Sequence, residues 1–353
     1  MKLLTAKKRK IAVLFTGGLG DSLLFVPLLK SFKRKEFHIT CVFYSTEIGD
    51  CLYDDSLYNN KIYIRSKAGL IYYALRHIKQ YVNFYINHLG KGRTIRFAAR
   101  VSSHRITQTG GSLDQNKKHH RWIPFEPDLT DAEQNLRLVF SFSNAQIVKI
   151  QEFQLERPQK DRKIISHLLA NDISDYFIIQ VSAGNNKTPH KNWPIQNWIE
   201  LVKNLCKDFP NQTFVIVGDV NEMAYVKDFD ALDRTNCCVL IGKTSIREVF
   251  NLVAFSNGYI GLDSGIMHMA VVLQKKTLTI FGASNEKLYG YARIQPSDHR
   301  VITAPVLCRP CSSWIGANIS RIKDPLQCPD FACLTQIKRE TVYNLFHEHF
   351  KPL

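Results

Sequence analysis

Short apolar runs that end at glycine or small polar residues recur along this chain. The first covers residues 11–15 and ends at a glycine-rich turn, after which a helical pattern reaches Phe32. A second apolar run at residues 39–44 completes a strand–helix–strand unit. Continuous apolar runs are typical of parallel strands that are buried on both faces. The pattern therefore predicts an α/β domain in the first part of the chain.

The pattern is less regular in the region that follows. Residues 62–64 and 105–107 favour short strands, residues 70–89 favour an aromatic-rich helix or pair of helices, and residues 131–142 favour a helix. Residues 151–163 are polar and charged without a period, which predicts an interdomain linker. The aromatic residues between 70 and 89 form either an interfacial surface or, as is commoner, part of a core. They are Tyr72, Tyr73, Tyr81, Phe84 and Tyr85.

A second α/β half follows the linker. Its strands are predicted at residues 176–181, 213–217, 238–241, 259–262 and 277–281. Amphipathic helices are predicted between them, and a last helix at 338–350. Most of these strands end in a small polar or glycine-containing turn, and ligands of such sheets bind beyond the carboxyl ends of the strands. The chain is thus divided into domains at 1–160 and 161–335, with a C-terminal helix at 336–353.

One strand–turn–helix segment has the features of a phosphate site. Residues 259–262 are mostly apolar, Asp263-Ser264-Gly265 form a tight turn, and a helix begins at Ile266. Asp263 or Ser264 can cap this helix, and Gly265 permits close approach of a ligand to the backbone. The free N–H groups and positive dipole end of a helix attract phosphate. An ordinary capped helix is the alternative.

Composition and charge narrow the function. The chain has 353 residues, 45% hydrophobic content and 22% charged content, which is typical of a globular protein. No run of 18 apolar residues occurs, and charges occupy the N-terminus where a signal peptide needs an apolar core, so we expect neither a transmembrane helix nor export. The net charge of +16 predicts an anionic partner, either nucleic acid, a membrane surface or a phosphorylated substrate. Nucleic acid is not favoured, since no nucleic-acid-binding motif is present.

Three stretches together resemble glycosyltransferase family 9, the heptosyltransferases of lipopolysaccharide core assembly. They are Gly20-Asp21-Ser22-Leu23-Leu24-Phe25-Val26-Pro27, then Lys191-Asn192-Trp193-Pro194 with Trp198 and Leu201, then Gly242-Lys243-Thr244-Ser245 leading to Asp263-Ser264-Gly265 with His268 and Ala270. The resemblance covers residues 11 to 335. It implies an α/β fold of the GT-B type, with two Rossmann-like domains that face each other across a cleft.

The resemblance also implies an inverting transfer that needs no metal and no cofactor. The donor would be ADP-heptose, and the acceptor the Kdo/heptose inner core on lipid A. The protein would be cytoplasmic, peripheral on the inner face of the inner membrane, where its basic surface meets anionic lipid. Two alternatives stay open: transfer from another nucleotide-sugar, carrying a hexose or an N-acetylhexosamine, to a lipopolysaccharide or surface glycan, and a non-catalytic nucleotide-binding protein.

Two residues match catalytic positions of the family. Asp21 matches the proposed base that deprotonates the acceptor hydroxyl, and its alternative role is a helix cap. Lys191 matches the lysine near the donor phosphates, and its alternative is an exposed lysine at the start of a helix. Gly18 and Gly20 would let the acceptor approach the backbone closely.

The remaining site residues are assigned to the donor. Ser182 and Gly184 follow the first strand of the second half and would contact phosphate, as would the N–H groups of Ser264 and Gly265. Asp263 would bind sugar hydroxyls or hold the turn. His268 would donate to a phosphate or sugar oxygen, with core packing as its alternative. Two weaker matches complete the set. Glu222 would contact the ribose hydroxyls, and Thr244 would contact the base.

Four of the nine cysteines lie close together in the sequence, as the pairs Cys308/Cys311 and Cys328/Cys333. Two such pairs can form a structural zinc site. The second pair has wider spacing than usual, so reduced buried or loop cysteines are the favoured interpretation, and no metal is expected in catalysis. Disulfides are not expected in the cytoplasm.

Overall fold

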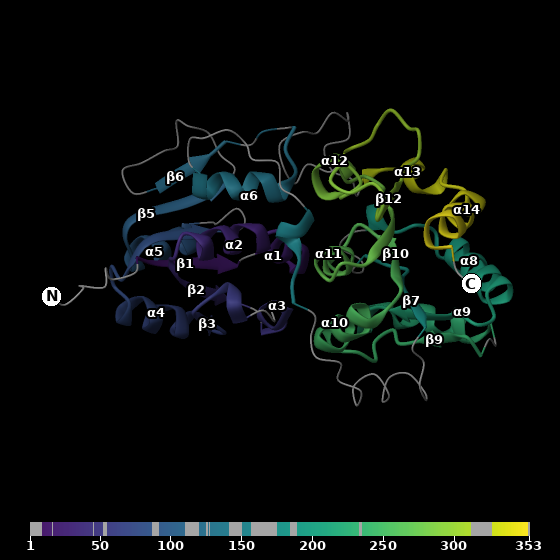
Figure 1. The fold of residues 1–353 in the computed structure, drawn as a ribbon, viewed down its shortest axis with the longest axis horizontal. Coiled ribbons are helices and arrows are strands. Elements are labelled where there is room, and N and C mark those ends of the chain that lie inside the picture. Colours follow the sequence, from purple (N-terminus) through teal and green to yellow (C-terminus); the bar gives the residue numbers. More distant parts are fainter. Residues whose placement is uncertain are drawn as a thin grey trace. The chain divides into compact units, whose positions relative to one another are not determined.

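The computed structural model describes residues 9–15, 17–44, 46–51, 55–86, 92–109, 120–124, 126, 128–140, 150–156, 175–183, 189–232, 235–311 and 327–351. The chain forms two compact units, Met1–Leu155 and Glu156–Leu353 (Figure 1). No helix among the described residues is both long enough and apolar enough to cross a membrane.

The first unit is built on a parallel sheet. Its described strands are β1 (Lys10–Phe15), β2 (His38–Phe43), β3 (Asn60–Tyr63), β4 (Tyr81–Ile86), β5 (Ser102–Thr109) and β6 (His120–Ile123). Their order in the sheet is β3-β2-β1-β4-β5-β6. This is the Rossmann order, and its direction reverses between β1 and β4. Loops that follow these two strands therefore border the crevice in which such sheets bind ligands.

Helices cover both faces of this sheet. Alternate side chains of β1 point to opposite faces, so that Leu14 joins a core with Tyr73 and Phe97, while Phe15 packs on Phe25. The described helices are α1 (Leu19–Leu23), α2 (Val26–Arg34), α3 (Thr46–Cys51), α4 (Lys67–Arg76), α5 (Gly92–Val101), α6 (Asp131–Phe140) and the 3-10 turns η1 (Asp55–Leu57) and η3 (Ile150–Phe153).

The helical prediction for residues 70–89 is wrong in its second half. Helix α4 ends at Arg76, Lys79 adopts a positive φ of 55°, and β4 then enters the sheet between β1 and β5. The aromatic residues conceal this strand, because they suit a buried strand as well as a helix. Tyr73, Tyr81 and Tyr85 are buried, as the core interpretation predicts, whereas Tyr72 is exposed and the side chain of Phe84 lies outside the described residues. Strand β6 was also not predicted.

The second unit repeats the architecture of the first. Its described strands are β7 (Tyr176–Gln180), β8 (Thr213–Val217), β9 (Cys237–Val239), β10 (Gly258–Leu262), β11 (Lys276–Ile280) and β12 (His299–Ile302), of which β12 was not predicted. The parallel sheet has the order β12-β11-β10-β7-β8-β9, again the Rossmann order, and reverses between β7 and β10. The ends of β7 and β10 therefore define the expected ligand site of this unit.

Amphipathic helices pack on this second sheet. In α8 (Ile195–Asp208), Trp198, Leu201, Val202 and Leu205 are buried at helical spacing. Phe346 of α14 (Arg339–Phe350) packs on the rings of sheet residues Phe177 and Phe214, so the predicted C-terminal helix is part of this core. The other described helices are α9 (Val226–Asp230), α10 (Ile246–Phe255), α11 (Gly265–Val272), α12 (Glu286–Tyr289), α13 (Ala332–Thr335) and the 3-10 turns η5 (Pro189–Lys191) and η6 (Val220–Tyr225).

The segment predicted as a linker packs, in its first part, on the first unit. Phe153 and Leu155 are buried, and Arg34 forms an ion pair of 2.8 Å with Glu152. The rest of that segment, beyond Glu156, lies outside the described residues.

Candidate active site

The turn between β10 and α11 is capped as its sequence predicts. Ser264 is the N-cap of α11, and its Oγ accepts hydrogen bonds from the N–H groups of Ile266 (3.2 Å) and Met267 (3.5 Å). The first-turn N–H of Gly265 is left for another partner. This turn directly follows the carboxyl end of β10, at the reversal of strand order.

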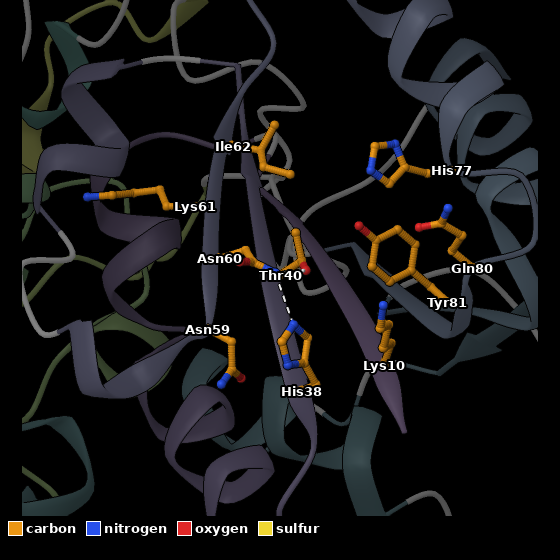
Figure 2. A pocket seen from close by; sticks show the side chains of 10 residues that line it. All are labelled: Lys10, His38, Thr40, Asn59, Asn60, Lys61, Ile62, His77, Gln80 and Tyr81. Atoms are coloured by element: carbon orange, nitrogen blue, oxygen red, sulfur yellow. Dashed lines mark hydrogen bonds between the residues drawn. The ribbon is translucent and has the colours of Figure 1, made fainter. Parts of the chain in front are cut away.

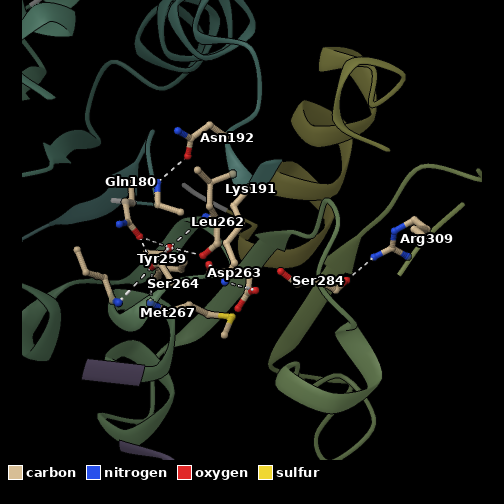
Figure 3. A network of polar contacts seen from close by, with 12 residues as sticks. Gln180, Lys191, Asn192, Tyr259, Leu262, Asp263, Ser264, Met267, Ser284 and Arg309 are labelled. Carbon is tan, nitrogen blue, oxygen red and sulfur yellow. Dashed lines mark hydrogen bonds and ion pairs between the residues drawn. The ribbon is translucent and has the colours of Figure 1, made fainter. Parts of the chain in front are cut away.

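Lys191 lies against this turn and pairs with Asp263. The Nζ atom is 2.8 Å from Asp263 Oδ2 and donates to the Asp263 carbonyl oxygen at 3.2 Å (Figure 3). The exposed fractions of the two side chains are 11% and 4%. Burial by itself would raise the pKa of the Asp263 carboxyl, but the Lys191 ammonium and His268 hold it below its usual range. Asp263 is therefore charged, and it fixes the lysine beside the start of α11.

Gln180 and Tyr259 hold the turn from behind, and sequence reasoning missed both. Gln180 Oε1 accepts from the hydroxyls of Tyr259 (2.7 Å) and Ser264, while the Tyr259 hydroxyl accepts from the Leu262 N–H at 3.1 Å (Figure 3). A Cβ atom at Gly261 would lie 2.3 Å from the Tyr259 hydroxyl, so only glycine fits there. The available signal was that Gln180 is the one amide in the otherwise apolar run at residues 176–181.

Two hydroxyls of the predicted donor set have no partner within the described residues. Ser182 follows β7 and is 1% exposed, and its Oγ has no hydrogen-bond partner; the same is true of Thr244 Oγ1. Buried hydroxyls are normally hydrogen-bonded, so each has capacity for a ligand or water. Gly184 lies outside the described residues, and Asn192 Oδ1 accepts from the nearby N–H of Ala183 at 2.8 Å.

His268 and Glu222 already have partners in this unit. His268 is buried, and its Nδ1 lies 2.8 Å from the Tyr291 hydroxyl. Glu222 is also buried and accepts from the N–H of Asp219 at 3.1 Å, which closes a capping box at η6. The contacts to a donor expected of both residues stay predictions.

Arg309 is a further residue that sequence reasoning missed. Its guanidinium donates to the carbonyl oxygens of Gly282 (3.0 Å) and Ser284 (3.1 Å), and it pairs with Glu286 at 3.0 Å. These contacts hold the turn that follows β11, which neighbours β10 (Figure 3). A single arginine in a cysteine-rich segment offers no sequence signal for this role.

In the first unit, Asp21 lies in the turn that follows β1. It is the third residue of α1, and its Oδ2 accepts from the N–H of the N-cap residue, Gly18, at 2.7 Å. A Cβ atom at Gly17 would lie 2.4 Å from that oxygen, so the glycine makes room for the carboxylate. Asp21 therefore caps the helix, and Gly20 lies in the same turn of helix. The capping role does not remove its carboxylate from solvent, because Asp21 is only partly buried.

Asp131, at the start of α6, is a second carboxylate close to Asp21. Burial, and then the negative charge of Asp21, raise the pKa of Asp131 to about 7. Asn135 Nδ2 donates to Asp131 Oδ2 at 3.4 Å and to the carbonyl of Leu24 in the Asp21 turn. A carboxyl that titrates near neutral pH beside the predicted base is a feature of functional sites. This proximity could not be predicted from the sequence, because Asp21 and Asp131 are far apart along the chain.

The four clustered cysteines are all reduced in the structure. Cys311 and Cys333 are buried, whereas Cys308 is exposed and Cys328 partly exposed. Burial raises the pKa of the Cys333 thiol to about 12, and nearby Cys311 and Cys328 add to the effect. Within the part of the chain that the structure describes, no group of three His, Cys, Asp or Glu side chains is placed to hold a metal ion.

Comparisons with known proteins agree with this fold. Lipooligosaccharide heptosyltransferase 2 of Campylobacter jejuni is 23% identical over 86% of this chain and 89% of its own length. A family 9 glycosyltransferase structure from Veillonella parvula has a TM-score of 0.78 at 16% identity, covering 99% of both chains. ADP-heptose lps heptosyltransferase II from E. coli has a TM-score of 0.74 at 16% identity, covering 97% of this chain and 98% of that one. The fold is thus the predicted GT-B type, with two Rossmann-like units.

A family model described as glycosyltransferase family 9 (heptosyltransferase) matches residues 100–313, more than half of the chain. The matched region contains Lys191, Asp263 and the β10–α11 turn. The chain therefore belongs to glycosyltransferase family 9, and it is a glycosyltransferase.

Proposed function

We propose that this protein is an inverting, metal-independent heptosyltransferase. It moves heptose from ADP-heptose to the Kdo/heptose inner core of lipopolysaccharide. The observation that carries the proposal is the buried Lys191–Asp263 pair beside the start of α11, at the strand-order reversal of the second unit. The names of the relatives support the substrates: one acts in lipooligosaccharide assembly and another is an ADP-heptose enzyme.

The second unit binds the donor. The Lys191 ammonium and the N–H groups of Ser264 and Gly265 neutralise the diphosphate as its charge increases in the transition state. The hydroxyls of Ser182 and Thr244 have no hydrogen-bond partner among the described residues, so each can bond to the nucleotide. Ser182 contacts a phosphate, Thr244 contacts the base, and Glu222 contacts the ribose hydroxyls. Asp263 keeps the lysine in place and contacts sugar hydroxyls, with His268 beside it. These charges take the role that a metal ion has in other glycosyltransferases.

The first unit supplies the base. The acceptor hydroxyl attacks the anomeric carbon from the face opposite the diphosphate, so its oxygen–carbon bond forms while the bond from carbon to phosphate oxygen breaks. Asp21 takes the hydroxyl proton, and the nucleoside diphosphate leaves with the bonding electron pair. Gly18 and Gly20 let the acceptor reach the carboxylate. One displacement inverts the configuration at the anomeric carbon.

The net charge of +16 fits an acceptor that carries phosphates and carboxylates on a lipid anchor. We place the protein in the cytoplasm, peripheral on the inner face of the inner membrane, with lipid A–Kdo as its partner and no nucleic acid.

A donor screen tests the proposal. ADP-, UDP- and GDP-sugars are offered with defined Kdo-containing acceptors, and nucleoside diphosphate release and product configuration are measured. We expect release with ADP-heptose and an inverted product. Preferential transfer from a hexose or N-acetylhexosamine donor would instead identify the protein as a transferase of another nucleotide-sugar. Retention of configuration in the product would contradict the single-displacement mechanism.

A further inference from the structure

Helix α4 exposes apolar side chains that its neighbours do not cover. Ile71, Tyr72, Leu75 and Ile78 are 61%, 59%, 52% and 49% exposed, and Ile78 lies two residues after the end of the helix. Their spacing places them along one side of α4, while Tyr73 and Ala74 on the other side are buried in the core. These four residues are here called the α4 ridge. Single exposed apolar residues are ordinary on a surface, but four within eight positions form a patch.

A polar cavity of about 440 Å³ adjoins the C-terminal end of α4. His77 and Gln80 line it from that end, and Lys10 and His38 line it from the amino ends of β1 and β2 (Figure 2). Asp21 follows the carboxyl end of β1, so the cavity is at the opposite edge of the sheet from the predicted base. The cavity is separate from the proposed reaction.

The lining of this cavity suits an anion. None of its ten residues is acidic, and Lys10, His38 and His77 supply basic nitrogen (Figure 2). Asn60 Nδ2 lies 2.9 Å from His38 Nε2 and orients that ring. Lys61 also lines the cavity, but its ammonium donates to the Gly49 carbonyl at 3.2 Å and points away from the other lining groups (Figure 2).

The chain segment that carries the ridge has charges of one sign. Between Asp55 and Asp114 the sequence has no Asp or Glu, although it contains ten Lys or Arg residues. The Arg76 guanidinium lies 5.0 Å from the centre of the Tyr72 ring on the ridge. Helix α5 packs beside α4 and exposes Arg96 and Arg100. An apolar ridge with basic residues on its flanks is the pattern of an interfacial helix.

We propose that the α4 ridge and the adjoining cavity form a docking face for an anionic bilayer. The ridge enters the headgroup region, and the cavity receives a lipid headgroup phosphate beside Lys10. Charge complementarity and the aliphatic character of the ridge favour a bilayer. A surface that binds single-stranded nucleic acid stacks bases on aromatic rings, whereas Ile71, Leu75 and Ile78 are aliphatic. The inference rests on the proposed function for its purpose, since a lipid-linked acceptor is met at the membrane.

Vesicle sedimentation tests the ridge. The full chain is mixed with phosphatidylcholine vesicles, or with vesicles that also contain phosphatidylglycerol, at several salt concentrations, without donor or acceptor. We expect binding to the anionic vesicles that weakens with salt, and a loss of about tenfold in Ile71→Glu and in Leu75→Glu. The control Leu307→Glu changes a leucine of the second unit that is even more exposed, at 102%, and should leave binding unchanged.

A second arm tests the cavity. Lys10→Gln should weaken binding to anionic vesicles about fivefold, whereas Lys203→Gln, an exposed lysine on α8, should not. The opposite result would be that inorganic phosphate raises the melting temperature of the wild type but not of Lys10→Gln, while both bind vesicles equally. The cavity would then bind a soluble anion, and the proposal that it receives a lipid headgroup would be wrong.

Other outcomes would overturn the docking face. Ridge variants that bind anionic vesicles like the wild type exclude it. A wild-type dimer that Ile71→Glu dissociates, measured by sedimentation velocity, shows that the ridge joins two copies instead. These measurements involve no transfer reaction, and the ridge variants should use a water-soluble acceptor at the wild-type rate. Failure of docking is therefore distinct from failure of the proposed function.

Discussion

The Lys191 ammonium lies 2.8 Å from the Asp263 carboxylate, and both side chains are largely buried. The two residues come from different elements, Lys191 from the end of η5 and Asp263 from the turn after β10. A buried pair is most costly when one partner is lost, because the other charge is left uncompensated. If Lys191 binds the donor as proposed, a change at this pair alters both the stability of the fold and donor binding.

Changing Lys191 to Met should lower the free energy of unfolding by about 3–5 kcal/mol, because it leaves the Asp263 charge buried alone. In Lys191→Met combined with Asp263→Asn, most of that stability should return while transfer stays absent, since the diphosphate has lost its cation. Urea unfolding and nucleoside diphosphate release measure the two effects. Recovery of transfer in the double variant would limit Lys191 to a structural role.

Changing Asp21 to Asn should lower kcat about 10²–10⁴-fold with little loss of stability. The asparagine oxygen can still accept from the Gly18 N–H, so the cap is kept. The matched control is Glu248→Gln, since Glu248 likewise accepts from the N–H of an N-cap residue, Ser245, at 2.7 Å. The control should keep full activity. Near-wild-type transfer by Asp21→Asn would show that Asp21 is a cap alone.

Asp131 should make the first unit less stable as pH rises. Its pKa is about 7 in the folded protein, against roughly 3.9 for an unfolded aspartate, so between these values the folded form holds a proton that the unfolded form releases. Stability from this group is thus lost as pH increases from about 4 to 7. Asp131→Asn should exceed the wild type by about 1–3 kcal/mol near pH 8 and match it near pH 4.

Urea unfolding across this pH range checks the Asp131 prediction. The exposed Asp128→Asn is the control and should show no such difference. A stability difference in Asp131→Asn that does not change with pH would mean that Asp131 does not titrate in this window.

Gln180 should act as a positioning residue for the donor turn. Gln180→Ala removes the acceptor of two hydroxyls and should lower stability by about 1–3 kcal/mol. We also expect a higher KM for the donor with a smaller change in kcat, because the Ser264 turn loses its support. Asn251→Ala alters another buried amide, on α10, and should affect stability without affecting donor KM. Equal donor KM values in both variants would make Gln180 merely structural.

Chelation should leave transfer unchanged. In the proposed mechanism, Lys191 and the backbone N–H groups of the β10–α11 turn supply the positive charge that the diphosphate needs. Dialysis against EDTA, followed by assay with and without added Mg²⁺ or Mn²⁺, measures this. A loss of activity that one of these ions restores would contradict the metal-independent mechanism, and metal analysis of the dialysed protein would show whether the cysteines retain an ion.

Local patterns predicted those features that depend on neighbours in sequence. Ser264 caps α11 as predicted because its contacts span only two or three residues. The β4 strand was mistaken for helix because its environment is set by β1 and β5, which are distant in the sequence. Aromatic residues tolerate either structure, and the sheet decided between them.

The sequence by itself determined two α/β halves, the capped turn at Asp263–Gly265, and the resemblance that singles out Asp21 and Lys191. Only the tertiary structure showed that Gln180 supports Ser264, that Asp131 lies near Asp21, and that α4 exposes its apolar side. The reason is physical: parallel strands far apart in the chain are joined by backbone hydrogen bonds, and their loops meet only where the strand order reverses. Periodicity records which residues are buried, but the partner of a buried polar group is chosen by the fold.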